Sequence, residues 1–208
     1  MATVSAKRRR QFGPDSAGTL MTPREFDRAN FVEGWRYELV NGVLIVSPPS
    51  LENERDPNEE LGYLLRTYRD THPQGWCLDA TLFEQTVKTA SNRRRADRVI
   101  WAGLGRQPQP KDVPTIVVEF VSEGKRDRKR DYEEKRDEYL ALGVQEYWVI
   151  DRFQRTLTVY SRRGKKTRKR VIGEKQIYAT PLLPGFELPM ARLLALANGW
   201  PKSEAEPA

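Results

Sequence analysis

The apolar positions near the N-terminal end alternate with polar ones at the spacing of a β-strand. In RYELVNGVLIV, Tyr37 and Leu39 alternate with charged residues, and Asn41-Gly42 follows at the point where the pattern reverses. Asn-Gly supplies the two positive-φ positions that a tight two-residue turn requires. The pattern predicts a β-hairpin in which Glu38 lies on the face opposite Tyr37 and Leu39.

Two segments carry the signals of helix starts. TPRE at 22–25 has a capping threonine, a proline at the first helical position and a glutamate three residues after the cap, so a short helix is expected there, ending near Asn30. DPNE at 56–59 repeats this pattern. An amphipathic helix is predicted after it, because apolar residues follow at helical spacing at Leu61, Leu64, Leu65 and Tyr68.

The middle of the chain predicts strands. Residues 76–88 and 95–103 indicate two strands joined by a polar turn at Ser91-Asn92. The nearly continuous apolar run IVVEFV at 116–121 is typical of a central strand that is covered on both faces.

A helix and a second hairpin are expected after that run. Residues 125–142 end in Tyr139, Leu140 and Leu142 before Gly143, which favours a helix with a glycine cap. EYWVID and TLTVYS predict a hairpin, and RRGKKTRKR at 162–170 predicts a loop. The alternation of strands and helices predicts a mixed α/β sheet with helices on its faces, as one domain over residues 21–197.

Glu119 stands at the centre of the apolar run. An ionised carboxylate in a dry interior costs several kcal/mol unless a cation or several hydrogen bonds meet it. A compensating partner is therefore expected, or the strand is not buried. Asp97 lies in a second short apolar run, RADRVI, and the two acids could converge on one Mg²⁺ if their strands are neighbours. The alternative is that each acid pairs with a nearby arginine.

The predicted helix that follows offers a cation. Lys135 lies four residues after Asp131 and four before Tyr139, so the three line one helical face. Its aliphatic stem could cross apolar surface and bring the ammonium to the sheet. The alternatives are a solvated lysine and a Tyr139 that only packs.

Composition narrows the classes of function. Lys plus Arg number 36 against 29 acids, and this net charge of +7 suits a polyanionic partner. Cys77 and His72 are the only residues of their types, so a disulfide framework or a zinc site is excluded and a metal would need oxygen ligands. The absence of an 18-residue apolar run predicts a cytoplasmic protein with no membrane partner. Residues 1–20 and 198–208 are polar and aperiodic, which predicts disordered tails.

Basic clusters are candidates for contacts with nucleic-acid phosphates, although charge runs are more often solvated faces. Their members are Arg93, Arg94, Arg95, Lys165, Lys166 and Arg168, with Lys169 and Arg170 beside them.

Several motifs occur together in an ordered series: RYELVNGVLIVSPP, RADRVIW, TIVVEFVSE, RDYEEKRDEYLALGVQEYWVID and LLPGFEL. With this series the chain resembles the Uma-two family of the PD-(D/E)XK nuclease superfamily, whose members are regarded as restriction endonucleases. The resemblance covers roughly residues 21–196. It implies a restriction-endonuclease-like fold, a mixed β-sheet core flanked by helices.

The resemblance also implies roles for site residues. Asp97 would be the motif aspartate, Glu119 the second acid and Glu38 an additional acid, and the three would hold Mg²⁺ or Mn²⁺. The superfamily's lysine normally lies two residues after the second acid, where this chain has Val121. Lys135 is similar to a lysine that has moved to the next helix.

Two departures from the family pattern stand out. Ala96 replaces a proline before the aspartate, and Ser122-Glu123-Gly124 stands where a serine-proline-serine turn is usual. The connection before Asp131 is two residues longer than usual, so the position of Lys135 depends on that connection.

The expected function is a metal-dependent endonuclease that hydrolyses phosphodiester bonds in DNA. Asp131 and Tyr139 are expected to support the site residues. The alternatives are a catalytically inactive nucleic-acid-binding protein with the same fold, and an interaction module or homodimer that uses the aromatic residues of GWRYEL and EYWVI.

Overall fold

The computed structural model describes residues 11–122, 128–164 and 166–200. The chain divides into two compact units, each described here by itself. The first contains residues up to Pro49 together with Thr86–Arg95, and the second contains Ser50–Gln85 and the chain from Ala96 onward. The single domain expected over residues 21–197 stays a prediction.

The first unit is built around the predicted hairpin. Strands β3 and β4 pair antiparallel, and Asn41 and Gly42 take the positive φ values of 50° and 78° that the tight turn requires. Tyr37 and Leu39 are buried with Met21, Phe26 and Leu44, which confirms the predicted apolar face. The elements of this unit are β1 (Gln11–Phe12), η1 (Pro14–Ser16), α1 (Pro23–Phe26), β2 (Asn30–Phe31), β3 (Arg36–Val40) and β4 (Val43–Ser47).

Residues 11–20 do not match the tail that was expected there. Disorder was predicted over residues 1–20, but β1 pairs with β2 and Leu20 forms a bridge to Val43, so that prediction is wrong for residues 11–20. Phe12 supplies the reason, since its ring packs on the buried cluster beside Phe31. Residues 1–10 and 201–208, the remainder of the two predicted tails, lie outside the described residues.

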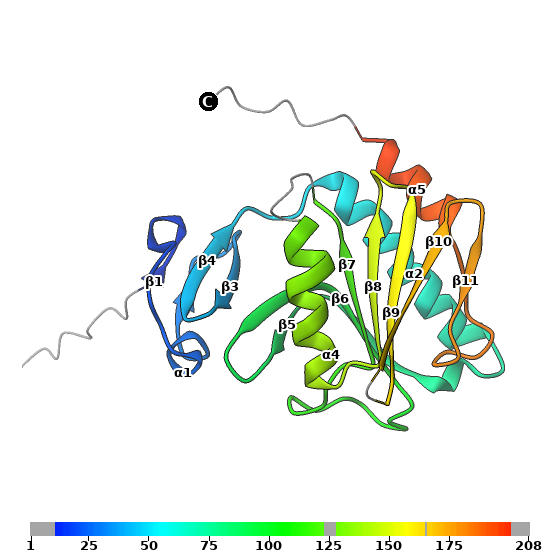
Figure 1. Ribbon diagram of the computed structural model, residues 1–208, viewed down its shortest axis with the longest axis horizontal. Coiled ribbons are helices and arrows are strands. Elements are labelled where there is room, and N and C mark those ends of the chain that lie inside the picture. The colour runs from blue at the N-terminus through cyan, green and yellow to red at the C-terminus, as the bar shows by residue number, and fades with distance from the viewer. Residues whose placement is uncertain (1–10, 123–127, 165, 201–208) are drawn as a thin grey trace, which may run out of the picture. The chain divides into compact units, whose positions relative to one another are not determined.

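The second unit contains the central strands. Within it the strand order is β10-β9-β8-β7-β6, with β7 and β8 parallel and the other neighbours antiparallel, and β5 also pairs with β6 (Figure 1). Strand β5 ends in the first unit, and strand β6 begins there. The bounds are β5 (Leu78–Lys88), β6 (Arg93–Ala102), β7 (Ile116–Phe120), β8 (Glu146–Asp151), β9 (Thr156–Arg163), β10 (Lys166–Gly173), β11 (Ile177–Ala179) and β12 (Glu187–Pro189).

Helices cover both faces of this sheet (Figure 1). One face carries the main apolar core, in which Ile116, Val118 and Trp148 pack against Leu61 and Leu193. These last two lie on α2 (Glu52–Thr71) and α5 (Met190–Asn198). The opposite face is covered by α4 (Lys135–Leu142), whose Tyr139 ring meets the ring of Tyr147 edge-on. The central strand is therefore buried on both faces, and the predicted α/β fold is confirmed.

Three elements differ from those expected. The helix predicted to begin at Pro57 begins at Glu52 and contains Pro57 in its first turns. Residues 166–170, predicted as part of a loop, belong to strand β10, because the register of β10 on β9 places Ile172 opposite Leu157 in the core. The C-terminal helix α5 was not predicted, and its buried Leu193 and Leu194 supply part of the core. Short turns occur at η2 (Gly75–Cys77) and η3 (Arg130–Glu134).

Among the residues described, none of the helices has the length and apolar character needed to cross a membrane.

Candidate active site

Glu119 is buried on β7, and the structure shows how that is tolerated. Its side chain is 2 % exposed. The ammonium of Lys135 lies 2.8 Å from its Oε2 atom, and the hydroxyl of Tyr139 donates to its Oε1 atom at 3.0 Å. The compensating partner is thus a lysine and not one of the nearby arginines. Tyr139 has a polar role in addition to its packing.

The backbone before α4 explains how Lys135 reaches the sheet. Residues Arg130–Glu134 form a π-helical turn, in which the N–H of Lys135 donates to the carbonyl of Arg130 five residues earlier. Such insertions rotate the following side chains, and they are frequent at functional sites. Lys135 is 3 % exposed at its side chain and also lies 3.4 Å from the carboxylate of Asp131. The structure therefore brings Asp131, Lys135 and Tyr139 to Glu119 from one helical face, as predicted.

Asp97 lies on the neighbouring strand, opposite Glu119. The antiparallel register pairs Arg98 with Val118, and the two acids are the next residues along this ladder. Opposite residues of an antiparallel pair project to the same face. The Oδ2 atom of Asp97 accepts a hydrogen bond from the N–H of Phe120 at 2.8 Å, which ties its carboxylate to β7. The condition for the two acids to approach each other is thus met, because β6 and β7 are neighbouring strands.

These charges form one buried electrostatic cluster. Burial raises the pKa of Glu119 to about 8; the carboxylates of Asp97 and Asp131 raise it too, while Lys135 opposes the shift. Burial likewise raises the pKa of Asp131 against the effect of Lys135 and Arg130. Arg130 contacts Asp131 at 3.2 Å. The carboxyl groups of Asp97, Glu119 and Asp131 thus lie close together with the cations of Lys135 and Arg130.

This donor set fits a hard divalent cation better than a soft one. Asp97 and Glu119 offer carboxylate oxygens, the ligands that Mg²⁺ and Mn²⁺ prefer, and such a cation would compensate the charge of both side chains. Within the described parts of the chain, no group of three or more His, Cys, Asp or Glu side chains is arranged to hold a metal. The protein ligands would therefore be the two carboxylates, with water or phosphate oxygens completing the shell.

Glu38 belongs to the first unit and is held there by the backbone. It is 9 % exposed, and its Oε1 atom accepts a hydrogen bond from the N–H of Arg95 at 2.8 Å. Its predicted role as an additional acid of the site stays a prediction.

The basic cluster at 93–95 differs from its expected role. Arg93 is 8 % exposed, and its guanidinium forms a two-point contact with Asp27 at 2.9 and 3.0 Å. Arg94 is 2 % exposed. The prediction that these two arginines contact phosphates is wrong for the structure described, because their heads are buried in the protein; Arg95 is half-buried. Lys166 and Arg168 are exposed on β10, and Lys165 lies outside the described residues.

Two polar residues that support the cluster were missed. Asn58 on α2 donates from Nδ2 to the carbonyl of Asp97 at 2.9 Å and accepts from the Nε of Arg98 at 2.7 Å. Arg98 is 2 % exposed. The signal was present, since Asn58 precedes Leu61 and Leu65 by three and seven residues and so interrupts the apolar stripe of its helix with a polar group.

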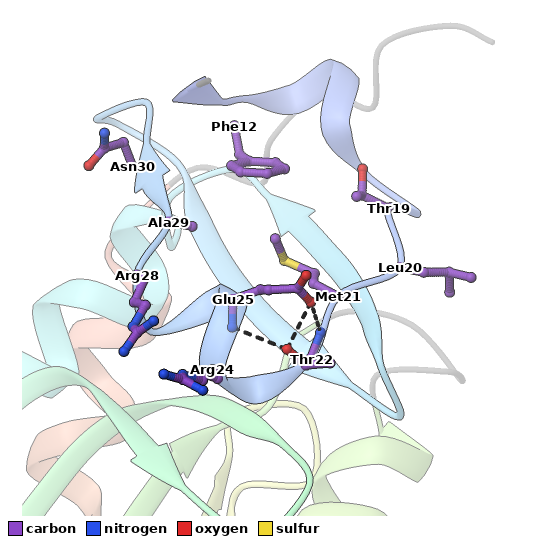
Figure 2. A pocket seen from close by; sticks show the side chains of 10 residues that line it. All are labelled: Phe12, Thr19, Leu20, Met21, Thr22, Arg24, Glu25, Arg28, Ala29 and Asn30. Carbon is purple, nitrogen blue, oxygen red and sulfur yellow. Dashed lines mark hydrogen bonds between the residues drawn. The ribbon is translucent and has the colours of Figure 1, made fainter. Parts of the chain in front are cut away.

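The first unit also carries an open hollow of about 820 Å³ beside α1, which contains none of the predicted site residues (Figure 2). Its acid, Glu25, turns to Thr22 and accepts hydrogen bonds from the N–H and the hydroxyl of that residue at 2.6 and 2.8 Å. Glu25 is thus committed to the capping box that the sequence predicts. Phe12, Leu20 and Met21 supply apolar wall, and Arg24 and Arg28 are exposed at the rim.

Comparison with known proteins identifies the class. The model of the Uma2 (Uma-two) family, described as "Putative restriction endonuclease", matches residues 23–191. The chain belongs to this family, as its motifs predict.

A solved structure of "a putative nuclease belonging to DUF820" from Anabaena variabilis is similar to this chain, with a TM-score of 0.66 and 15 % sequence identity. The match covers 85 % of this chain and 99 % of the other, and it shows the shared α/β fold. No curated protein matches the chain.

Proposed function

We propose that this protein is a metal-dependent endonuclease that hydrolyses phosphodiester bonds in DNA. The observation that carries the proposal is the buried cluster of Asp97 and Glu119 on adjacent strands, with the ammonium of Lys135 at 2.8 Å from Glu119. Membership in a family described as restriction endonucleases supports the same reaction class. Two acids and a lysine that lie together suit hydrolysis of a phosphate ester, because the acids could hold a metal ion and the ammonium could offset the negative charge that develops.

The side chains take separate roles in this proposal. Asp97 and Glu119 would hold Mg²⁺ or Mn²⁺, which when bound would supply Lewis-acid stabilisation and a more acidic water. Lys135 would offset charge on the phosphate and hold a proton near it. Asp131 and Tyr139 would position Lys135 and Glu119, since Asp131 contacts Lys135 and Tyr139 donates a hydrogen bond to Glu119. Glu38 as a further ligand stays an expectation from the sequence.

Nicking of supercoiled plasmid tests the proposal. The full chain is expected to convert supercoiled DNA to nicked circles with Mg²⁺ or Mn²⁺ and to stop when EDTA is added. Asp97→Asn, Glu119→Gln and Lys135→Met should each lower the rate by at least about a hundredfold, the order of magnitude of a lost transition-state donor.

Lys129→Met is the matched control for the lysine variant. Lys129 lies six residues earlier and is exposed, so its removal changes the net charge equally without touching the cluster. Circular dichroism of every variant separates loss of activity from loss of fold. Equal nicking by the folded cluster variants and the unmodified protein would show that the cluster is not the active site.

A second candidate is a nucleic-acid-binding protein without catalysis. It is favoured by the contacts that both carboxylate oxygens of Glu119 already make, one with Lys135 and one with Tyr139. This candidate predicts DNA binding that weakens steeply with salt and does not respond to Mg²⁺, without nicking under any condition. The nuclease proposal predicts that cluster variants lose nicking while retaining DNA binding.

A further inference from the structure

A narrow groove in the second unit is lined by several arginines. It has a volume of about 190 Å³ and lies where β9 and β10 meet the segment that includes β11. Its lining includes Arg162, Arg168 and Arg170 together with the polar residues Gln145, Glu146, Ser161 and Tyr178. All three arginines are exposed.

The strand register places two of these arginines side by side. Arg168 pairs with Ser161 and Arg170 pairs with Val159, a residue of the main core. Residues two apart on a strand project to the same face, roughly 7 Å from each other. Arg168 and Arg170 therefore lie on the face that carries α2 and α5.

The carboxylate cluster lies on the other face of this sheet. Glu119 pairs with Val149, whereas Val118 pairs with Trp148, and Trp148 pairs in turn with Val159. Because successive residues alternate between faces, Glu119 and Val159 project to opposite sides. The groove is consequently separate from the candidate active site.

The charge in the groove is strongly positive. The one acid of its lining, Glu146, is 6 % exposed, and its Oε2 atom accepts hydrogen bonds from Trp148 Nε1 at 2.8 Å and from the Tyr178 hydroxyl at 2.9 Å. This carboxylate is thus held inward. Across the ranges that the structure describes, neither Arg168 nor Arg170 forms an ion pair with an acid.

One arginine head of the groove rests on an aromatic ring. The guanidinium of Arg170 lies 5.8 Å from the centre of the Tyr178 ring. Arg162 turns to the other face of the sheet, where its Nη1 donates to the carbonyl of Leu140 on α4 at 3.1 Å. A head that rests on a ring loses less conformational entropy on binding, and the planar fork of a guanidinium matches the oxygens of a phosphate.

We propose that this groove binds a phosphate group of a nucleic-acid backbone. The inference rests on the proposed function for the identity of the polymer. An extended polyanion is favoured over a single anion because the segment KTRKRVIG carries four cations and no acid, and Lys169 continues the positive charge on the other face of β10. A second copy of the chain is disfavoured at this edge strand, since pairing two such strands would bring like charges together.

Salt-dependent binding of labelled duplex and single-stranded DNA tests the inference, with the full chain in EDTA so that cleavage does not interfere. Arg168→Gln/Arg170→Gln should lower affinity and reduce the slope of log affinity against log salt by about 0.9 for duplex or about 0.7 for a single strand, the value for the loss of one phosphate contact. Arg24→Gln/Arg28→Gln is the matched control, because it removes the same charge from exposed positions of the first unit. Equal slopes for the two double variants would overturn the inference.

Titration of the Arg168 and Arg170 side-chain NMR signals with inorganic phosphate and with DNA separates the two sources of phosphate. Shifts with DNA at far lower concentrations than with inorganic phosphate support the inference, whereas shifts with inorganic phosphate alone would assign the groove to a free anion. Plasmid nicking reads the proposed function separately. If the unmodified protein does not nick plasmid but the Arg168/Arg170 variant has a smaller salt slope, the nuclease proposal is refuted and the groove inference is supported. If the protein nicks plasmid and the slope of the variant is unchanged, the nuclease proposal is supported and the groove inference is refuted.

Discussion

Replacing Lys135 by methionine is the most direct perturbation of the buried cluster. The substitution keeps an unbranched side chain of similar length in the same cavity and removes only the ammonium. That ammonium lies 2.8 Å from Glu119 and 3.4 Å from Asp131, and all three side chains are 3 % exposed or less. Removing one partner of a buried ion pair costs about 3–5 kcal/mol, because a charge is left in the interior without its partner. At about 2–4 °C per kcal/mol for a chain of this size, the melting temperature should fall by roughly 10 °C.

A double-mutant cycle with Glu119→Gln gives the magnitude of the interaction. Glu119→Gln should cost less than Lys135→Met, since Lys135 retains Asp131 as a partner. The double variant should be more stable than the sum of the two losses predicts, by about 1–3 kcal/mol, because the carboxylate that lacks a partner is gone. Urea unfolding followed by far-ultraviolet circular dichroism measures all four free energies of unfolding, provided that a single transition is seen.

The pH dependence provides an independent test. The pKa of Glu119 is raised from 4.5 to about 8 in the folded protein, so the folded state binds more protons than the unfolded state between these values. The contribution of Glu119 to stability is therefore fully present below about pH 4.5 and is lost as pH rises toward 8. The free energy of unfolding should change through this group by at most about 1.4 kcal/mol per pH unit. Glu119→Gln should remove this slope. Three results would refute the reasoning. They are a loss of unfolding free energy below about 1 kcal/mol in Lys135→Met, strict additivity in the double-mutant cycle, and a pH dependence of stability that Glu119→Gln leaves unchanged.

Two further predictions concern residues outside the cluster. Gly62→Ala should destabilise the protein by about 1–3 kcal/mol in thermal melts, although alanine is normally the better helix former. The reason is that the added Cβ would lie 2.6 Å from the guanidinium of Arg98, which Asn58 holds in place. A gain in stability would contradict this prediction. Arg93→Gln should destabilise the first unit by about 1–3 kcal/mol at neutral pH, because the buried head loses its two-point contact with Asp27. Arg93 lowers the pKa of Asp27, so that contribution is present above pH 3.8 and is lost as pH falls through the lower folded pKa; equal losses at pH 7 and pH 2 in urea titrations would argue against it.

Local structure was predictable wherever short-range chemistry decides it. The Asn41-Gly42 turn, the Thr22 capping box and the alternation around Tyr37 depend on neighbours within a few residues, and each is present as predicted. The family motifs added the fold class and a set of candidate site residues, and the structure places the ammonium of Lys135 beside Glu119.

Long-range pairing was not predictable in the same way. Residues 166–173 have the charge of a loop, and only the register of Ile172 on Leu157 makes them a strand. Arg93 was predicted to be a surface cation, but in the fold it forms a contact with Asp27, 66 residues earlier in the chain. In both cases the deciding contact joins segments far apart in the chain, and no local spacing encodes it.

The sequence by itself determined that Glu119, if its apolar run is buried, needs a cation or several hydrogen bonds, because burying a bare carboxylate is too costly. The tertiary structure decided that the strand is buried and which groups compensate the charge. A π-helical turn at Arg130–Glu134 directs Lys135 and Tyr139 to Glu119, while the register of β6 and β7 places Asp97 opposite it. The physical reason is that the charge demands a partner wherever it is buried, whereas the partner's identity depends on the geometry of a connection and a strand pairing that exist only in the folded chain.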